Sequence, residues 1–238
     1  MRKSRVAGLV FLATAILAQQ QQTVEITSEP SHHQVFQNEY VRVFDVTVAP
    51  KASTLVHRHN YDYIFVTLGD SDVVSVRLGE KPVSLLLKDG EVRYTPGHFA
   101  HAAINESDRP FHNITIELLK PSSNVKTCTE SCLDSSYICG GICPERTKLI
   151  SSDQWSVWMI TVPPTAQVDK QLHAVPQLIV PVSGLEFGVQ PGSADSPIRR
   201  APGQIDWLPS GPMHPLINNE KHAARFVALE FNPEQPKP

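Results

Sequence analysis

The sequence has little excess charge and no long apolar segment beyond its first residues. The net charge is −3 and charged residues make up 19% of the 238 residues, with no basic stripe. Because proteins hold nucleic acids largely through Lys and Arg contacts with phosphates, this composition argues against a nucleic-acid partner. A transmembrane helix needs about 18 or more apolar residues, and no segment after the N-terminus meets that length, so we expect no stable membrane anchor.

The N-terminus has the pattern of an export signal. Three basic residues within the first five precede an apolar stretch from Val6 to Leu17, and small residues lie around Ala18. This order is typical of a signal peptide at residues 1–18, with cleavage near Ala18. A retained transmembrane anchor is the alternative, but the stretch is shorter than a span. We therefore expect a secreted or periplasmic protein.

Only four cysteines are present, and all lie in one short segment: Cys128, Cys132, Cys139 and Cys143. In an exported chain an even number of cysteines indicates disulfides, and four allow three pairings. The symmetric spacing favours a hairpin with Cys128 paired to Cys143 and Cys132 paired to Cys139. A structural zinc site is the alternative. Residues 122–149 have few apolar residues, and we expect them to form a linker.

The rest of the chain predicts strands. Twenty prolines and many Val and Ile in short runs favour strands broken by turns over long helices. The segment "GEVRYTPGHFAHAAIN", from Gly90 to Asn105, shares its Gly, Pro, His and Asn with "GQIDWLPSGPMHPLIN", from Gly203 to Asn218. The offset is 113 residues at each shared position. The sequence therefore contains two homologous all-β units.

These motifs resemble the cupin family. Its second motif is Gly, five residues, Pro, one, Gly, two, His, three, Asn. Residues 203–218 fit this pattern throughout, and residues 90–105 fit it except that His98 stands at the second glycine position. Its first motif, a His-x-His followed by an acid and later a Gly, is similar to "HRHNYDYIFVTLG" at residues 57–69. Here Lys51 stands at the usual upstream glycine, and the interval to the later glycine is shorter than usual.

The resemblance implies two tandem cupin jelly-roll (double-stranded β-helix) barrels. The expected bounds are residues 37–121 for the N-terminal barrel and residues 150–234 for the C-terminal barrel. Short strands bounded by Gly, Pro and Asn turns are what closed double-sheet jelly rolls are built from. Gly90 and Gly203 stand where a tight turn needs positive φ or a close backbone approach.

A metal site is predicted in the first barrel. His57 and His59 share one face of a strand because side chains alternate along it, and the family pattern places His101 on a facing strand. Asp62 stands at the usual glutamate and is the nearby carboxylate available as a fourth ligand. Three neutral imidazoles suit Cu, Zn, Fe or Ni. The alternative is a group of polar residues satisfied without a metal.

The second barrel has a weaker set of ligands. The repeat places Gln171 and His173 at the first two histidine positions, Gln177 near the acid and His214 at the third histidine. Amide oxygens lack the charge of a carboxylate and the basicity of an imidazole, so metal affinity is expected to fall steeply. We expect this barrel to keep the fold and a polar pocket without a metal.

The function implied by the resemblance is that of a metal-dependent oxidoreductase, similar to quercetinase-type dioxygenases, acting on a small oxygen-rich substrate. Oxalate decarboxylases are also two-cupin chains, but they have a glutamate in the metal site that this chain lacks. The alternative is a cupin that binds a small molecule or a metal without turnover. Fold resemblance does not choose between these functions.

Overall fold

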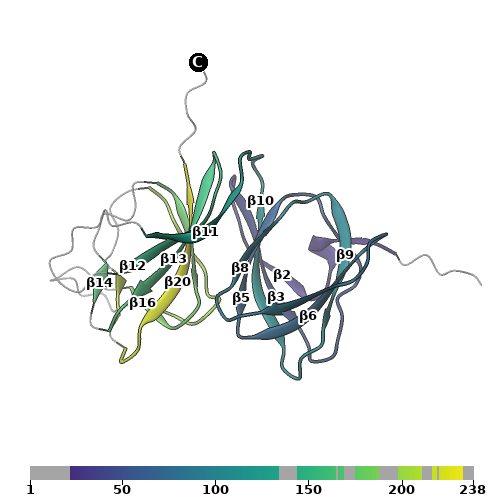
Figure 1. Cartoon of the computed structure of the whole chain (residues 1–238), viewed down its shortest axis with the longest axis horizontal. Helices are drawn as coiled ribbons and strands as arrows, with labels where there is room; N and C mark the ends of the chain where they lie inside the picture. Colours follow the sequence, from purple (N-terminus) through teal and green to yellow (C-terminus); the bar gives the residue numbers. More distant parts are fainter. Residues whose placement is uncertain are drawn as a thin grey trace, which may run out of the picture.

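The chain folds into two β-barrels that lie side by side (Figure 1). Apart from one 3-10 helix, η1 (Ile26–Ser28), the described elements are strands, and no described helix is long and apolar enough to cross a membrane. The predicted all-β, two-barrel architecture is therefore confirmed. The computed structural model describes residues 22–133, 144–164, 166–168, 175–187, 198–210, 216–218 and 220–232. The expected signal peptide, residues 1–18, lies outside them.

The first barrel consists of two five-stranded sheets. One sheet has the order β1 (Val24–Glu25), β4 (His57–His59), β9 (Phe99–Asn105), β6 (Ser71–Arg77), β7 (Val83–Leu87). The other has the order β2 (His32–Gln37), β3 (Val41–Val48), β10 (Phe111–Leu118), β5 (Tyr63–Leu68), β8 (Val92–Thr95). Strands β1 and β2 extend this barrel upstream of residue 37, the start expected from the repeat.

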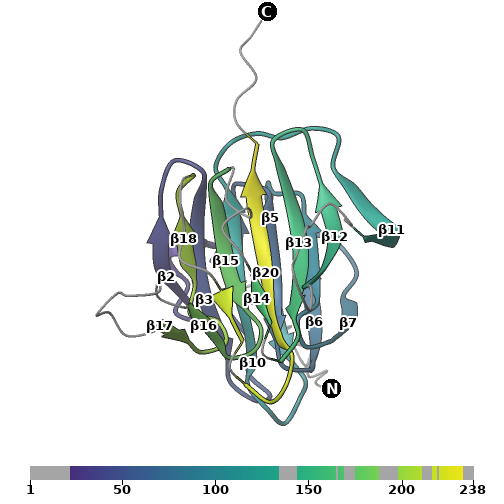
Figure 2. The same cartoon turned by 90° about the vertical axis from the view of Figure 1, so that its left-hand side faces the viewer.

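The second barrel consists of a six-stranded and a four-stranded sheet, and Figure 2 views it face on. The larger sheet has the order β11 (Lys126–Leu133), β12 (Glu145–Ser151), β13 (Trp155–Val162), β20 (Ala224–Phe231), β15 (Gln177–Pro181), β18 (Asp206–Leu208). The smaller sheet has the order β14 (Gln167–Val168), β19 (Leu216–Ile217), β16 (Leu185–Phe187), β17 (Ile198–Arg200).

The cysteine segment, expected as a linker, adds strands β11 and β12 to the larger sheet of the second barrel. The two strands pair antiparallel, with Cys132 opposite Lys148. Cys139, Cys143 and the side chain of Cys132 lie outside the described residues. The disulfide pairing therefore stays a prediction.

One buried apolar cluster joins the barrels. It is built from strands β3, β5 and β10 of the first barrel and β13, β15 and β20 of the second. Ile64, Ile116, Leu178 and Val227 in this cluster are fully buried. Since burying one such side chain contributes about 1.5–3 kcal/mol, the contact between the barrels is a core and not a loose hinge.

The glycines of the repeated motif are explained by their turns and by this contact. Gly90 has φ +76° and Gly203 has φ +80°, values that favour glycine. A Cβ on Gly203 would lie 2.8 Å from Leu68 of the first barrel, and a Cβ on Gly90 would lie 3.1 Å from Val182 of the second. The predicted positive φ and close approach are thus both confirmed, and each glycine packs against the other barrel.

The repeated asparagines anchor equivalent turns. Asn105 donates from Nδ2 to the carbonyl of Val48 at 3.0 Å, and Asn218 donates from Nδ2 to the carbonyl of Val162 at 2.8 Å. Both side chains are buried, so losing these bonds would leave unpaired polar groups. The repeat seen in the sequence therefore corresponds to a repeated turn.

The two departures from the family's glycine positions have left-handed backbone. Lys51 has φ +58° and His98 has φ +64°, although both are non-glycine residues. Such a conformation costs a non-glycine residue on the order of 1 kcal/mol. At these two positions the backbone has the left-handed conformation that suits glycine, although the residues are Lys51 and His98.

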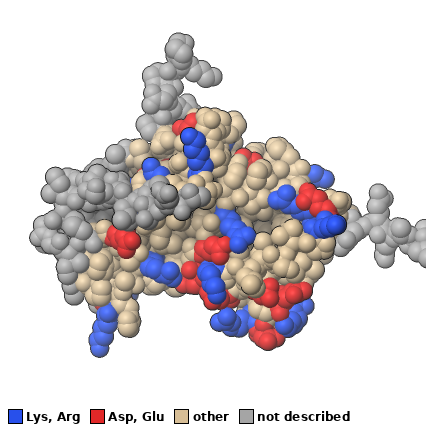
Figure 3. Space-filling model, viewed as in Figure 1, with Lys and Arg blue, Asp and Glu red and all other residues tan. Residues whose placement is uncertain are grey.

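The surface charge is mixed. Figure 3 shows acidic and basic side chains interspersed over the face in view, several of them in adjacent pairs. Among the exposed pairs, Lys88 Nζ lies 3.0 Å from Asp70 Oδ2. Pairs of this kind contribute little to stability, since solvent screens them.

Candidate metal centre

Three predicted histidines meet at one end of the first barrel. His57 and His59 lie on β4 with Arg58 between them on the opposite face, and each histidine is 1% exposed. In the antiparallel pairing of β4 with β9, His57 lies directly opposite His101. His101 is therefore on a neighbouring strand of the same sheet, and the expectation of a facing strand is corrected, because adjacent antiparallel strands already bring paired side chains to about 5 Å.

The Nε2 atoms of these histidines converge. His59 Nε2 lies 3.2 Å from His57 Nε2 and 3.2 Å from His101 Nε2. A tetrahedral ion with metal–nitrogen distances of about 2.0–2.1 Å separates its ligand nitrogens by about 3.3 Å. The two pairs that include His59 Nε2 are therefore already spaced as two ligands of a transition-metal ion require.

Hydrogen bonds on the far side of the rings set which nitrogen faces the centre. His57 Nδ1 lies 2.9 Å from the carbonyl oxygen of Leu55. A carbonyl only accepts, so in neutral His57 the proton is on Nδ1 and the Nε2 lone pair faces His59. His101 Nδ1 is 3.1 Å from Ser75 Oγ, which orients the third ring in the same way. Such outer contacts are typical of metal-ligating histidines.

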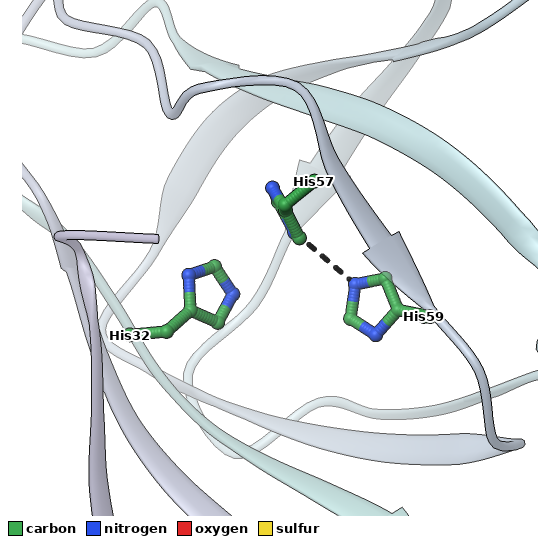
Figure 4. A group of neighbouring side chains, drawn as sticks. All are labelled: His32, His57 and His59. Atoms are coloured by element: carbon green, nitrogen blue, oxygen red, sulfur yellow. Dashed lines mark hydrogen bonds between the residues drawn. The ribbon is translucent and has the colours of Figure 1, made fainter. Parts of the chain in front are cut away.

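A fourth histidine, absent from the sequence prediction, faces the centre from the opposite sheet. His32 lies on β2, and Figure 4 shows its ring beside those of His57 and His59. One ligand nitrogen from each of these three residues lies within 4.8 Å of the others, and the cluster suggests a metal ion. The rings of His32 and His57 have centroids 4.5 Å apart.

His32 is held by a buried carboxylate. Its Nδ1 donates to Glu29 Oε2 at 2.6 Å, and the same carboxylate accepts the backbone N–H groups of Ser31 and Leu55. Burial alone would raise the pKa of Glu29, but the hydrogen bond from His32 and the two N–H groups outweigh it and keep that pKa below its ordinary value. A charged Glu29 thus fixes the proton on His32 Nδ1 and leaves Nε2 free to bind a metal.

Burial keeps the imidazoles neutral, which ligation requires. It lowers the pKa of His57 to about 4, with a further contribution from His32. It lowers the pKa of His101 to about 3, and His57, His32 and Arg77 add to the effect. The pKa of His59 is also lowered, by burial first and then by its histidine neighbours. At neutral pH these three rings therefore offer lone pairs and not charges.

The histidines open onto a cavity of about 330 Å³ inside the first barrel. His59 is stacked on Tyr63, with ring centroids 4.1 Å apart. Burial raises the pKa of Tyr63 to about 12, so its hydroxyl is a donor at neutral pH. The other lining residues are of two kinds. Half are apolar: Val46, Val48, Phe65, Val73, Val83, Leu85, Leu87, Ala103 and Phe111. The others are polar or charged: Thr54, Ser75, Arg77, Glu80, Arg93, Tyr94, Thr95, Asn113 and Thr115.

Comparison with known proteins identifies the fold. No family model and no curated protein matches the chain. Among solved structures, AerE from Microcystis aeruginosa matches with a TM-score of 0.61 and 12% identity, over 86% of this chain and 99% of that one. A Cupin 2 conserved barrel domain protein from Leptotrichia buccalis matches with a TM-score of 0.54 and 8% identity, over 84% and 88%. A single-residue mutant of Bacillus subtilis oxalate decarboxylase matches with a TM-score of 0.54 and 12% identity, over 81% and 69%.

This chain has the two-barrel cupin fold. At identities of 8–12% the similarity establishes the fold alone. Any chemical activity must be argued from the residues of the site. The chain has its buried histidine cluster in the first barrel, where the His-x-His motif predicts it.

Asp62 is not part of the histidine cluster. Its Oδ2 accepts the hydroxyl of Tyr94 at 2.5 Å, and its Oδ1 accepts the N–H of Gly97 at 2.8 Å. Asp62 is also not among the residues that line the cavity. The prediction of Asp62 as a fourth ligand is therefore corrected: its short side chain anchors the turn before β9, and His32 stands nearer to the imidazoles.

The predicted polar pocket of the second cupin barrel lies mostly outside the described residues. This applies to Gln171, His173 and His214. Gln177 is described and is 1% exposed. It pairs across the sheet with Glu230, as Tyr63 pairs with Glu117. The register thus makes Gln177 the counterpart of Tyr63 and not of the acid.

Proposed function

We propose that the first barrel binds one divalent transition-metal ion through Nε2 of His57, His59 and His101, with His32 as a fourth nitrogen ligand. The observation that supports this most is the pair of 3.2 Å distances between their Nε2 atoms. In His57 the Nδ1 proton is held by a carbonyl, so a bare lone pair faces this space. Buried lone pairs that face one another repel unless a cation or a proton lies between them.

The ligand set favours copper or zinc. Imidazole nitrogens bind divalent ions in the Irving–Williams order, which places copper and zinc above iron and manganese. Neither Asp62 nor another described carboxylate joins the cluster, so the site lacks the oxygen ligands that manganese prefers. The N-terminal pattern supports export through the general secretory route, which would carry the chain across the membrane unfolded. The metal would then bind after export, in the periplasm or outside the cell.

We further propose that the bound metal serves oxidoreductase chemistry of the dioxygenase type on a small molecule. His57, His59, His101 and His32 would hold the ion, and a redox-active ion there would supply a path for electrons from substrate to dioxygen. The chain's own residues orient the imidazoles through Leu55, Ser75 and Glu29, and they line the cavity with both apolar and polar side chains. The cavity has both apolar and polar lining residues, which suits a small oxygen-bearing substrate with an apolar body.

Copper loading tests the proposal. Chelator-treated full-length protein receives one equivalent of Cu²⁺, and its electron paramagnetic resonance spectrum is recorded. We expect resolved coupling to four nitrogens, reduced by one in His101→Ala and unchanged in His222→Ala, an exposed histidine of the second barrel. A spectrum with oxygen ligands alone would contradict the metal site. Oxygen uptake by copper-, iron- and nickel-loaded protein then separates an enzyme from a binding protein, because a loaded protein that consumes no oxygen with any candidate substrate favours binding.

A further inference from the structure

Arg77 brings a positive charge to the histidine end of the cavity. It is the last residue of β6, where it pairs across the sheet with His101. Paired residues share a face, so the Arg77 side chain points into the barrel with His101, and it lines the cavity. The guanidinium is therefore close to the candidate metal centre.

The flat face of the Arg77 guanidinium packs on an aromatic ring, and its N–H groups remain available to donate hydrogen bonds to a ligand. Its central carbon lies 3.9 Å from the centroid of the Phe99 ring. The nearest carboxylate is that of Glu80 at 4.0 Å, beyond hydrogen-bond distance, and the Glu80 side chain is 59% exposed. No hydrogen bond to this guanidinium is found among the described residues. Arg93, which also lines the cavity, donates instead to Glu91 at 2.7 Å.

An arginine stacked on an aromatic ring and open at its edge is suited to an anion. Guanidinium presents five N–H donors in a plane and binds carboxylates through two parallel hydrogen bonds. Val73, Leu85, Leu87 and Phe111 supply apolar wall to the same cavity. The other cationic side chain in the lining, Arg93, is already paired with Glu91. A ligand that fits this lining has one anionic head and an apolar body.

We infer that the first barrel binds a small monocarboxylate with an apolar body, whose carboxylate contacts Arg77 beside the imidazoles. This deepens the proposed function and rests on it for the placement of the carboxylate next to a metal. A cavity of about 330 Å³ is at the small end of the range for ligand sites, so the body is a single ring or a short chain. A compact dianion such as oxalate would leave the apolar wall without a contact.

Matched pairs of ligands isolate the contribution of the charge. The probes are 3-phenylpropanoate and octanoate, each compared with its neutral amide by titration calorimetry on metal-free and copper-loaded protein. We expect the wild type to bind each acid at least tenfold more tightly than its amide. Arg77→Gln should abolish this preference and leave amide affinity within about twofold. Arg77→Lys should keep part of it, since a charge remains but the planar pair of donors is lost.

Arg58→Gln is the matched control. Arg58 lies between His57 and His59 on β4 and points to the opposite face, so this variant makes the same charge change outside the barrel. We expect it to keep the preference for acids. Equal binding of acid and amide by the wild type, or no binding of either acid, overturns the inference. If copper fails to bind but the Arg77-dependent preference for acids persists, the proposed metal site is wrong and the anion site is supported.

Discussion

Strands β10 and β20 occupy matching places in the two barrels, and their inward side chains differ. Strand β10 lies between β3 and β5, and β20 lies between β13 and β15. Where β10 has Asn113 and Thr115, which line the cavity, β20 has Phe226 and Ala228, each 113 residues later. At these two inward positions of the matching strand, the first barrel therefore has polar side chains and the second barrel has apolar ones.

A neighbouring strand adds bulk to the second interior. Trp158 on β13 pairs with Ala228 as Phe44 on β3 pairs with Thr115, so the register makes the larger Trp158 the counterpart of Phe44. Trp158 packs in one buried cluster with Phe226. The turns that hold the frame are alike in both units. We infer that the turn residues specify the barrel, and that the inward residues of these strands decide whether it holds a ligand or serves as packing.

Phe226→Ala should give the largest change in stability. Phe226 is fully buried in a close-packed cluster, and truncating such a residue costs about 3–5 kcal/mol. Phe111→Ala, at the first-barrel cavity, should cost less by about 1 kcal/mol or more, because one side of Phe111 already faces open space and has fewer contacts to lose. Urea unfolding of both variants measures the difference. Equal losses would show that the two interiors are packed alike.

Acid should destabilise the first barrel when it is free of metal. In the unfolded chain His57 titrates near 6.5, and in the folded chain its pKa is about 4, so between these values the unfolded state binds more protons. Its contribution, roughly 3 kcal/mol, is complete above pH 6.5 and is lost as the pH falls towards 4. His59 and His101 act in the same direction.

Urea unfolding at pH 7.5 and pH 5, with chelator present, measures this loss. His57→Gln should reduce the difference between the two pH values, because one of the titrating groups is removed. A free energy of unfolding that is unchanged between the two values would contradict the burial of neutral imidazoles.

Glu29→Gln should weaken metal binding without abolishing it. The carboxylate holds the Nδ1 proton of His32, and loss of such a partner typically lowers metal affinity by about 10–100-fold. Glu106→Gln, at an exposed position of the same barrel, is the control and should bind as the wild type does. Competition with a chromogenic chelator gives the affinities. Equal affinity of all three proteins would remove His32 from the ligand set.

His98→Gly should give a small gain in stability. His98 is exposed and has φ +64°, and the equivalent position of the second barrel has Gly211. Relief of the left-handed strain, offset in part by the flexibility of glycine, should add about 0.5–1 kcal/mol. The midpoint of urea unfolding should rise. A fall would mean that the imidazole of His98 makes a contact that outweighs the strain.

The sequence predicted the frame better than the site. The 113-residue offset between the two motifs predicted the repeated turns correctly. It could do so because the local backbone conformation of each turn requires its Gly and Asn. His57, His59 and His101 were found because strand alternation and the family motif both mark them. The repeat also held a clue to the second interior, since Phe226 stands at the place of Asn113.

His32 and Asp62 show where motif spacing fails. His32 reaches the centre from a strand of the other sheet, 25 residues before His57, and no period in the sequence connects the two. Its signal was local: Glu29 precedes it by three residues, a spacing that allows the pair to bond. Asp62 stands near the expected acid position, but a one-methylene difference and the shorter interval to the later glycine turn its carboxylate towards Tyr94 and Gly97.

The number of metal ions bound per chain tests the central claim, that one barrel has a competent site and the other does not. Chelator-treated full-length protein is incubated with Cu²⁺, desalted and analysed for copper, alongside His101→Ala and its second-barrel counterpart His214→Ala. We predict one ion per chain in the wild type, none in His101→Ala and one in His214→Ala. Two ions in the wild type, or equal losses in both variants, would contradict the account.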